Sequence, residues 1–329
     1  MSTIEISDAT SSTRKVAWAV AGTSLVRKAD GEQMTRAEIT EHADLDWTVE
    51  QHTLTANAIT PDGVGVDLPE HRALVRRNRD GSASGLGVRK TGYVPIQNDE
   101  MLDVMEATAA TAGAVWDSAG VLRGGRGVFA AITLPQHTLI GGVDAIGWTL
   151  LGRNYHDGSG AFTISATPVR LRCTNMMRSA LRSATATVTI RHTKSAPDRL
   201  SVAREALGLT TDYAAEWAAW ADRLVAEQMS RAEYVTLVER LVPVKDATTE
   251  RVQRNARDAQ DALLALWSAP TQANVAGTRW AALNAVAEYD EWFRPTRGNG
   301  APDVARATRT IDGGMGSLAE RAARLLTPA

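Results

Sequence analysis

Arginine and tyrosine side chains recur along strand-like segments in the middle of this 329-residue chain. Because residues two apart in a strand share a face, alternation assigns these side chains to polar strand faces. Guanidinium groups bind phosphates, and aromatic rings stack on unpaired bases at about 1 to 3 kcal/mol per base. The nucleic-acid-binding set predicted in this way is Arg89, Lys90, Tyr93, Arg123, Arg126, Arg153, Tyr155, Arg170, Arg172 and Arg191, with Arg178 on the following helix. The alternative interpretation is a solvated, arginine-rich sheet face with ordinary surface tyrosines.

The charge distribution supports an anionic partner. The net charge is −2, but residues 1–70 carry −7, residues 71–200 carry +7 and residues 201–329 carry −2. Such asymmetry is an argument about partners rather than about fold. The basic segment is the one that holds the predicted binding set.

Two strand assignments place individual arginines. In residues 86–98, Val88 and Ile96 are expected on the inner face, with Arg89 and Tyr93 on the polar face. The segment 161–173 changes its apolar phase after a proline. We therefore expect a β-bulge at or next to Pro168, because proline cannot donate to a ladder and bulges re-aim side chains. That bulge would turn Arg170 and Arg172 onto the polar face.

Other motifs carry weaker chemistry. The glycine-rich stretch 122–127 lacks the Gly-Lys-Ser/Thr of a phosphate-binding loop and is read as a strand bend or bulge, although its arginines can still face an anion. Two strand-to-helix junctions, at Asn98 and at Thr174 or Asn175, can either present backbone N–H groups to an anion or simply cap a helix.

No catalytic constellation stands out. The six histidines, at 42, 52, 71, 137, 156 and 192, show no close metal-ligand spacing. The single cysteine, Cys173, falls on an apolar strand face and is read as structural. His156 and Asp157 are open to two interpretations, a catalytic pair or a hairpin turn completed by Gly158. An enzyme is not predicted, and neither is a metal or another cofactor.

These side chains belong to an expected α+β fold. An antiparallel β-sheet core of β-β-β-α-like units is followed by an α-helical C-terminal region. We predict an N-terminal arm (1–44), a basic β-rich core domain (45–196) and a helical region (197–329), with a helix break at Gly208. Asp80-Gly81 predicts a hairpin turn, a helix should begin at Asn98 and stop near Gly113, and Trp217, Trp220 and Trp280 are expected in helix packing.

Composition indicates in which cellular compartment the protein is expected. One cysteine excludes an intramolecular disulfide framework, and no apolar run reaches the roughly 20 residues that cross a bilayer. The polar, acidic start is unlike a secretory leader. We expect a cytoplasmic protein with no membrane partner.

An ordered set of motifs adds a family resemblance. From about Leu45 to about Tyr289 the chain reads LDWTVE, GVRKTGYVPIQNDE, LRGGRGVFA, GRNYHDGSGA, TPVRLRCTN, IRHT, REALGL and GTRWAALNAVAEY. This order resembles a phage- and plasmid-like family of domains of unknown function, found in bacteriophages of actinobacteria. The resemblance implies a mobile-element origin and assigns no catalytic residues. The repeated strands followed by a helix are also similar in architecture to the single-strand annealing proteins of phages and eukaryotes, which form rings or filaments.

The expected function is therefore that of a phage-encoded, non-catalytic single-stranded DNA-binding and annealing protein of recombination or replication, working as a homo-oligomer. The alternative is a host-interference or regulatory protein that binds an anionic small molecule or an acidic partner through the same surface. A hydrolase or transferase using the loop at His156 and Asp157 is the third possibility.

Overall fold

The structure is a computed structural model, and it describes residues 35–57, 65–170, 175–176, 187–193, 199–244, 249–296 and 317–327, with single positions between 302 and 311. Its strands are β1 (Thr48–Ala56), β2 (Val66–Arg77), β3 (Ala83–Lys90), β4 (Val115–Leu122), β5 (Gly127–Ile140), β6 (Asp144–Tyr155), β7 (Phe162–Arg170), β8 (Asn175–Met176) and β9 (Thr187–Ile190). Its helices are α1 (Arg36–His42), α2 (Asn98–Ala112), α3 (Arg199–Ala226), α4 (Arg231–Leu241), α5 (Glu250–Trp267), α6 (Arg279–Glu288) and α8 (Leu318–Leu326), with 3-10 turns at Arg123–Gly125 and Pro270–Val275 and a π-helix at Tyr289–Phe293.

The strands form two antiparallel sheets. The smaller sheet has the order β1-β2-β3, and the larger has the order β4-β5-β6-β7-β8 with β9 also paired to β7. Helices α3 to α8 follow the last strand. The α+β class, with antiparallel sheets and helices toward the C-terminus, is confirmed.

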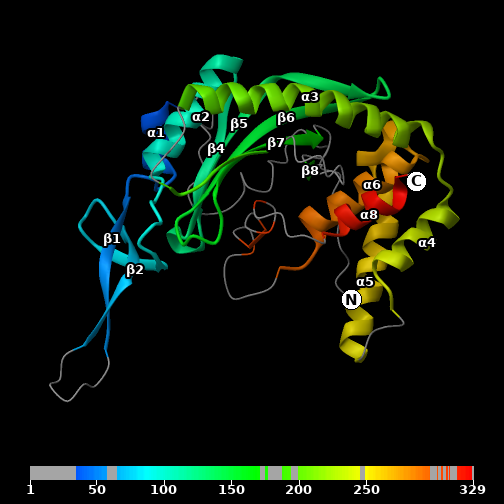
Figure 1. The fold of residues 1–329 in the computed structure, drawn as a ribbon. Coiled ribbons are helices and arrows are strands. Elements are labelled where there is room, and N and C mark those ends of the chain that lie inside the picture. Colours follow the sequence, from blue (N-terminus) through cyan, green and yellow to red (C-terminus); the bar gives the residue numbers. More distant parts are fainter. Residues whose placement is uncertain are drawn as a thin grey trace.

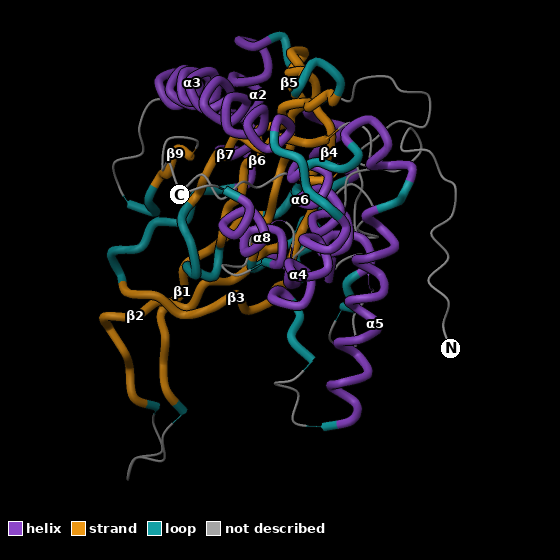
Figure 2. Tube along the Cα trace, turned by 90° about the vertical axis from the view of Figure 1, so that its right-hand side faces the viewer, coloured by secondary structure: helices purple, strands orange, loops and turns teal. Residues whose placement is uncertain are grey.

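The larger sheet has helices on one face. Figure 1 shows α2 and α3 lying across the arch of strands β4 to β7, with α4, α5, α6 and α8 packed at one end. The ribbon of β1 and β2 leaves the opposite end, and Figure 2 shows it projecting from the body in a second view. None of the described helices combines the length and apolar content needed to cross a bilayer.

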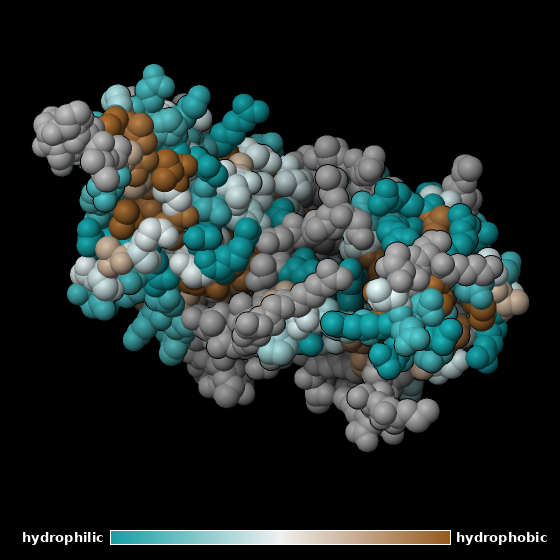
Figure 3. Space-filling model, turned by 90° about the horizontal axis from the view of Figure 1, so that it is seen from below, coloured by the Kyte–Doolittle hydropathy of each residue, from teal (hydrophilic) through white to brown (hydrophobic). Residues whose placement is uncertain are grey.

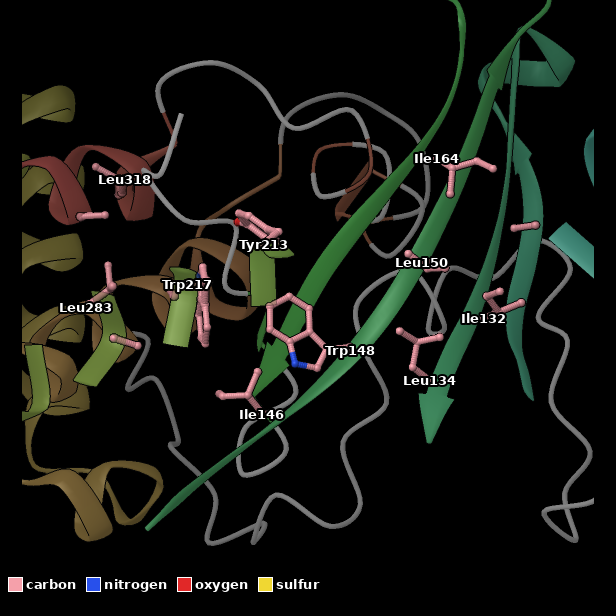
Figure 4. Close-up of a cluster of buried hydrophobic side chains, with 14 of the residues drawn as sticks. Ile132, Leu134, Ile146, Trp148, Leu150, Ile164, Tyr213, Trp217, Leu283 and Leu318 are labelled. Atoms are coloured by element: carbon pink, nitrogen blue, oxygen red, sulfur yellow. The ribbon is translucent and has the colours of Figure 1, made fainter. Parts of the chain in front are cut away.

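The hydrophobic core runs from the sheet into the C-terminal helices. Trp148 of β6 meets Trp217 of α3 edge-to-face at 5.6 Å (Figure 4). Trp217 meets Trp280 of α6 at the same separation. The indoles of Trp217, Trp220 and Trp280 are at most 2% exposed. The expectation that these tryptophans pack helices is confirmed, and the core is continuous across the boundary predicted at residue 197.

Local signals in the sequence fix several turns and one helix end. Gly81 has φ +85° in the β2–β3 turn and Gly158 has φ +68° in the β6–β7 turn, a conformation that glycine adopts without steric cost. Helix α2 ends at Gly113, which is left-handed (φ +61°) and donates its N–H to Ala109 O. Both hairpins and this helix end agree with the sequence. The break predicted at Gly208 is wrong, because α3 runs continuously through it, with open space around that glycine.

Two predicted strand registers are also wrong. β7 pairs with β6 in unbroken register from Arg153↔Thr163 to Ile146↔Arg170, so there is no bulge at Pro168. β3 ends at Lys90, and the predicted faces fail after Leu86, which is buried: Val88 on the same face is 42% exposed, while Arg89 is half-buried. In β7 both faces are largely buried, which removes the alternation on which the prediction relied. In β3 the β6–β7 turn covers Arg89 instead.

Candidate functional site: a basic surface and a buried polar cluster

A basic surface forms where two hairpin turns of the larger sheet meet the smaller sheet. We call it the hairpin-end cluster and define it as Arg72, Arg89, Arg123, Arg126 and Tyr155. The β6–β7 turn lies against β3 so closely that a Cβ added at Gly158 would overlap Arg89 Nε, and one added at Gly87 would lie 3.4 Å from Asp157 O. The two turns are tied together, because His156 N donates to Arg126 O at 2.9 Å.

Arg72 and Arg89 stand directly opposite each other in the β2–β3 ladder. Like charges in this position destabilise a sheet. Among the described residues, no ion pair joins an acid to Arg72, Arg89 or Arg126. Arginines elsewhere in the chain do have carboxylate partners: Arg36, Arg76, Arg77, Arg170, Arg279, Arg294 and Arg324. The positive charge of Arg72, Arg89 and Arg126 therefore has no ion-pair partner among the described acids, although Asp157 lies in the turn that packs against β3.

The two tyrosines of the predicted set are packed rather than free. The Tyr93 ring stacks on His192 with centroids 4.8 Å apart, its hydroxyl donates to Tyr155 O at 3.2 Å, and burial raises its pKa. The Tyr155 ring lies against Gly160 and Gly127, with the Arg123 guanidinium 5.2 Å from its centroid. Both rings are thus engaged by neighbouring groups of the protein, which leaves less ring surface for stacking on a base than two fully exposed tyrosines would offer.

The remaining predicted residues fall in different places. Lys90 is exposed on the opposite side of β3 from Arg89, and Arg191 is exposed next to His192. Arg153 is half-buried and donates to Ile311 O at 2.8 Å. Arg172 and Arg178, like Cys173, lie outside the described residues.

Arg170 is the clearest correction. It is fully buried, and its Nε donates to Asp144 at 2.6 Å. Its other nitrogens donate to Gln272 and Asn274, and Trp280 Nε1 donates to the same carboxylate at 2.7 Å. Arg170 therefore joins the sheet to the helices and does not line a surface. Its register opposite Ile146 places it on the helix-covered face.

A buried polar cluster lies beneath the hairpin-end cluster, around the junction Ile96–Asn98 that leads into α2. Asn98 Nδ2 donates to Leu45 O and Trp47 O, and its Oδ1 faces His156 Nε2 at 2.8 Å. Asn98 is thus not the helix cap. The cap position is Gln97, whose N–H donates to Glu100 and whose side-chain amide pairs with both backbone groups of Val49.

Hydrogen bonding fixes the tautomer of both buried histidines. Because both protons used by Asn98 Nδ2 go to carbonyls, Asn98 Oδ1 is an acceptor and His156 carries its proton on Nε2. His192 Nδ1 accepts from Ile96 N at 3.2 Å, so His192 carries its proton on Nε2. Burial lowers the pKa of His156 to about 3 and that of His192 to about 4. Both rings are therefore neutral near pH 7.

The loop at His156 and Asp157 has the geometry of a turn. His156 is fully buried and packs edge-on against Trp47, and Asp157 Oδ1 accepts from Ser159 N at 2.8 Å. These contacts match the hairpin interpretation of the motif. In the described parts of the chain, no group of three or more His, Cys, Asp or Glu side chains is placed to hold a metal ion.

Sequence reasoning missed Arg72, His192 and Asn154. Asn154 is buried and donates to Ile96 O. Arg72 begins the basic run of residues 72–79, and its place opposite Arg89 depends on the register across β2–β3. The contacts of His192 and Asn154 with Ile96 are 96 and 58 residues apart in sequence, so no local pattern signals them.

Fold and site together describe an α+β protein with a basic surface over a neutral, hydrogen-bonded core. A family model described as "Domain of unknown function (DUF932)" matches residues 85–311, and the chain belongs to this family. The match confirms the resemblance to a domain of unknown function. Comparison with curated proteins and with solved structures gave no match.

Proposed function

We propose that this protein binds single-stranded nucleic acid through the hairpin-end cluster, holding the strand by its phosphates. The observation that carries the proposal is the Arg72–Arg89 pair, two arginines directly opposite each other in the β2–β3 ladder. Their described side-chain hydrogen bonds go to backbone carbonyls, and neither forms a described ion pair with an acid. Such an arrangement costs free energy in the isolated chain and becomes favourable when a polyanion lies between the two groups.

The packing of Tyr93 and Tyr155 changes the expected mode of binding. With both rings already in contact with the protein, we expect phosphate contacts to contribute more affinity than base stacking. Binding should then be independent of sequence, and log K should fall with log salt by about 0.7 per phosphate contacted.

The test is fluorescence anisotropy with a labelled oligothymidylate over a salt series. Replacing Arg72 and Arg89 by glutamine should weaken binding and flatten the salt slope. The matched control is Arg254→Gln, which removes an exposed arginine of α5 with no described ion pair and should leave binding unchanged. Binding that is indifferent to salt, or equally reduced by the control, would refute the proposal.

The finer role is annealing of complementary strands in phage recombination or replication. The absence of a nucleotide requirement is part of this proposal. Quenching of a donor–acceptor oligonucleotide pair, mixed without ATP or divalent ions, measures annealing directly. Acceleration by the wild-type chain but not by the Arg72/Arg89 variant is the expected result.

The packed tyrosines favour a second candidate, a regulatory protein whose cluster holds an anionic small molecule. Native mass spectrometry of the purified chain would detect a co-purified nucleotide or other anion. Stabilisation by inorganic phosphate without any affinity for oligonucleotides would favour this candidate over the first.

A further inference from the structure

The ribbon of β1 and β2 extends beyond the support of the third strand. β3 pairs with β2 only from His71 to Arg77, and farther out only β1 and β2 pair, at Thr55↔Asp67 and Ala56↔Val66. Figures 1 and 2 show this part standing away from the body. An isolated two-stranded ribbon is at best marginally stable in water, so its outer part needs a partner surface.

The ribbon exposes apolar side chains. Val66 is 45% exposed and Leu68 is 38% exposed, although both belong to a strand. In Figure 3 the brown area on the left lies over this sheet. Exposed apolar area rimmed by polar groups is typical of an interaction site.

The charge of the ribbon indicates what kind of surface it can bind. Beyond the last pair of β2 with β3, at His71, the described residues 54–57 and 65–70 include Asp67 and Glu70 and no lysine or arginine. The hairpin-end cluster has the opposite charge and offers the aliphatic stems of its arginines to apolar side chains. Asp67 pairs with Thr55 beyond the last β2–β3 pair, that of His71 with Lys90, so it lies farther out along β2 than Arg72 does.

We propose that the outer ribbon of one chain docks on the hairpin-end cluster of a second copy. The interface joins two different patches, so each chain contributes one ribbon and one cluster. The inference rests on the same basic surface as the proposed function, and it makes the ribbon a competitor of nucleic acid for that surface.

The test separates the two halves of the interface. The ribbon variant Leu68→Gln/Glu70→Lys and the cluster variant Arg72→Glu/Arg89→Glu should each lose self-association, measured by light scattering after size exclusion at low salt and without nucleic acid. Mixing them should restore pairs, because the ribbon variant supplies an intact cluster and the cluster variant an intact ribbon. Leu139→Gln, which removes a 55% exposed side chain on β5, is the control and should associate like the wild type.

Each outcome decides the proposal. A wild-type chain that is monomeric, a mixture that stays monomeric, or variants that still associate would each overturn it. Near-UV circular dichroism of each variant checks that it is folded. Oligonucleotide binding is a separate readout: the ribbon variant should keep it, so loss of self-association with retained binding distinguishes this inference from the proposed function.

Discussion

Arg170 donates from Nε to Asp144 at 2.6 Å, and neither side chain is exposed to solvent. The pair links the end of β7 to the start of β6, and Trp280 extends it into α6. Buried ion pairs contribute little net stability, but removing one partner leaves an uncompensated charge in the interior.

Asp144→Ala is therefore expected to destabilise the fold by about 3 to 5 kcal/mol. Urea unfolding monitored by tryptophan fluorescence measures the loss. Glu320→Ala removes the acid of a partly exposed i,i+4 pair with Arg324 and should cost less than about 1 kcal/mol. Equal losses for the two variants would contradict the buried role of Asp144.

Gly158→Ala should weaken oligonucleotide binding, because its Cβ would displace Arg89 as well as strain a left-handed backbone. Gly81→Ala is a matched change, with φ +85° and open space around the Cβ. Both should lose about 1 kcal/mol of stability, since both demand positive φ from alanine. Only Gly158→Ala should reduce binding in the anisotropy assay.

The two buried histidines should make the folded protein less stable at low pH. Their pKa values of about 3 and about 4 lie below the ordinary 6.5, so the unfolded chain takes up protons first as pH falls. The stability they provide is fully present above about pH 6.5 and is lost as pH falls toward those values, by at most about 1.4 kcal/mol per pH unit for each ring. Urea midpoints across this range test it, and His192→Phe should flatten the profile. A midpoint that does not change with pH would contradict buried, neutral rings.

Asn98→Asp should be more damaging than Asn98→Ala. The carboxylate would face two backbone carbonyls that now accept from Asn98 Nδ2, in a fully buried position. We expect a loss above about 2 kcal/mol, measured by thermal unfolding. Asn78→Asp is the control, because Asn78 Nδ2 donates to a rotatable hydroxyl, that of Ser82, near the surface.

Local chemistry was readable from the sequence. The turns at Gly81 and Gly158 and the end of α2 at Gly113 each follow from residue types within a few positions. The helix packing of Trp217 and Trp280 followed from apolar spacing.

Long-range burial was not readable. Arg170 was assigned to a polar face because alternation assumes one wet face, whereas β7 is covered on both sides. Val88 and Arg89 were assigned to the wrong sides because β3 ends at Lys90 and the β6–β7 turn covers Arg89. The pairing of Arg72 with Arg89 needed the register of a sheet, which no single strand contains.

The array of tryptophans in the core has a spectroscopic consequence. Trp148, Trp217, Trp220 and Trp280 lie 5.6 to 6.2 Å apart in a chain of edge-to-face and tilted contacts. Indole transitions held at fixed angles over such separations couple, so the near-ultraviolet circular dichroism of this protein should be dominated by one chiral chromophore spanning sheet and helices. Separation of the helices from the sheet would abolish that signal while leaving the far-ultraviolet spectrum largely intact. The near-ultraviolet signal therefore reports directly on the contact between the sheet and helices α3 and α6.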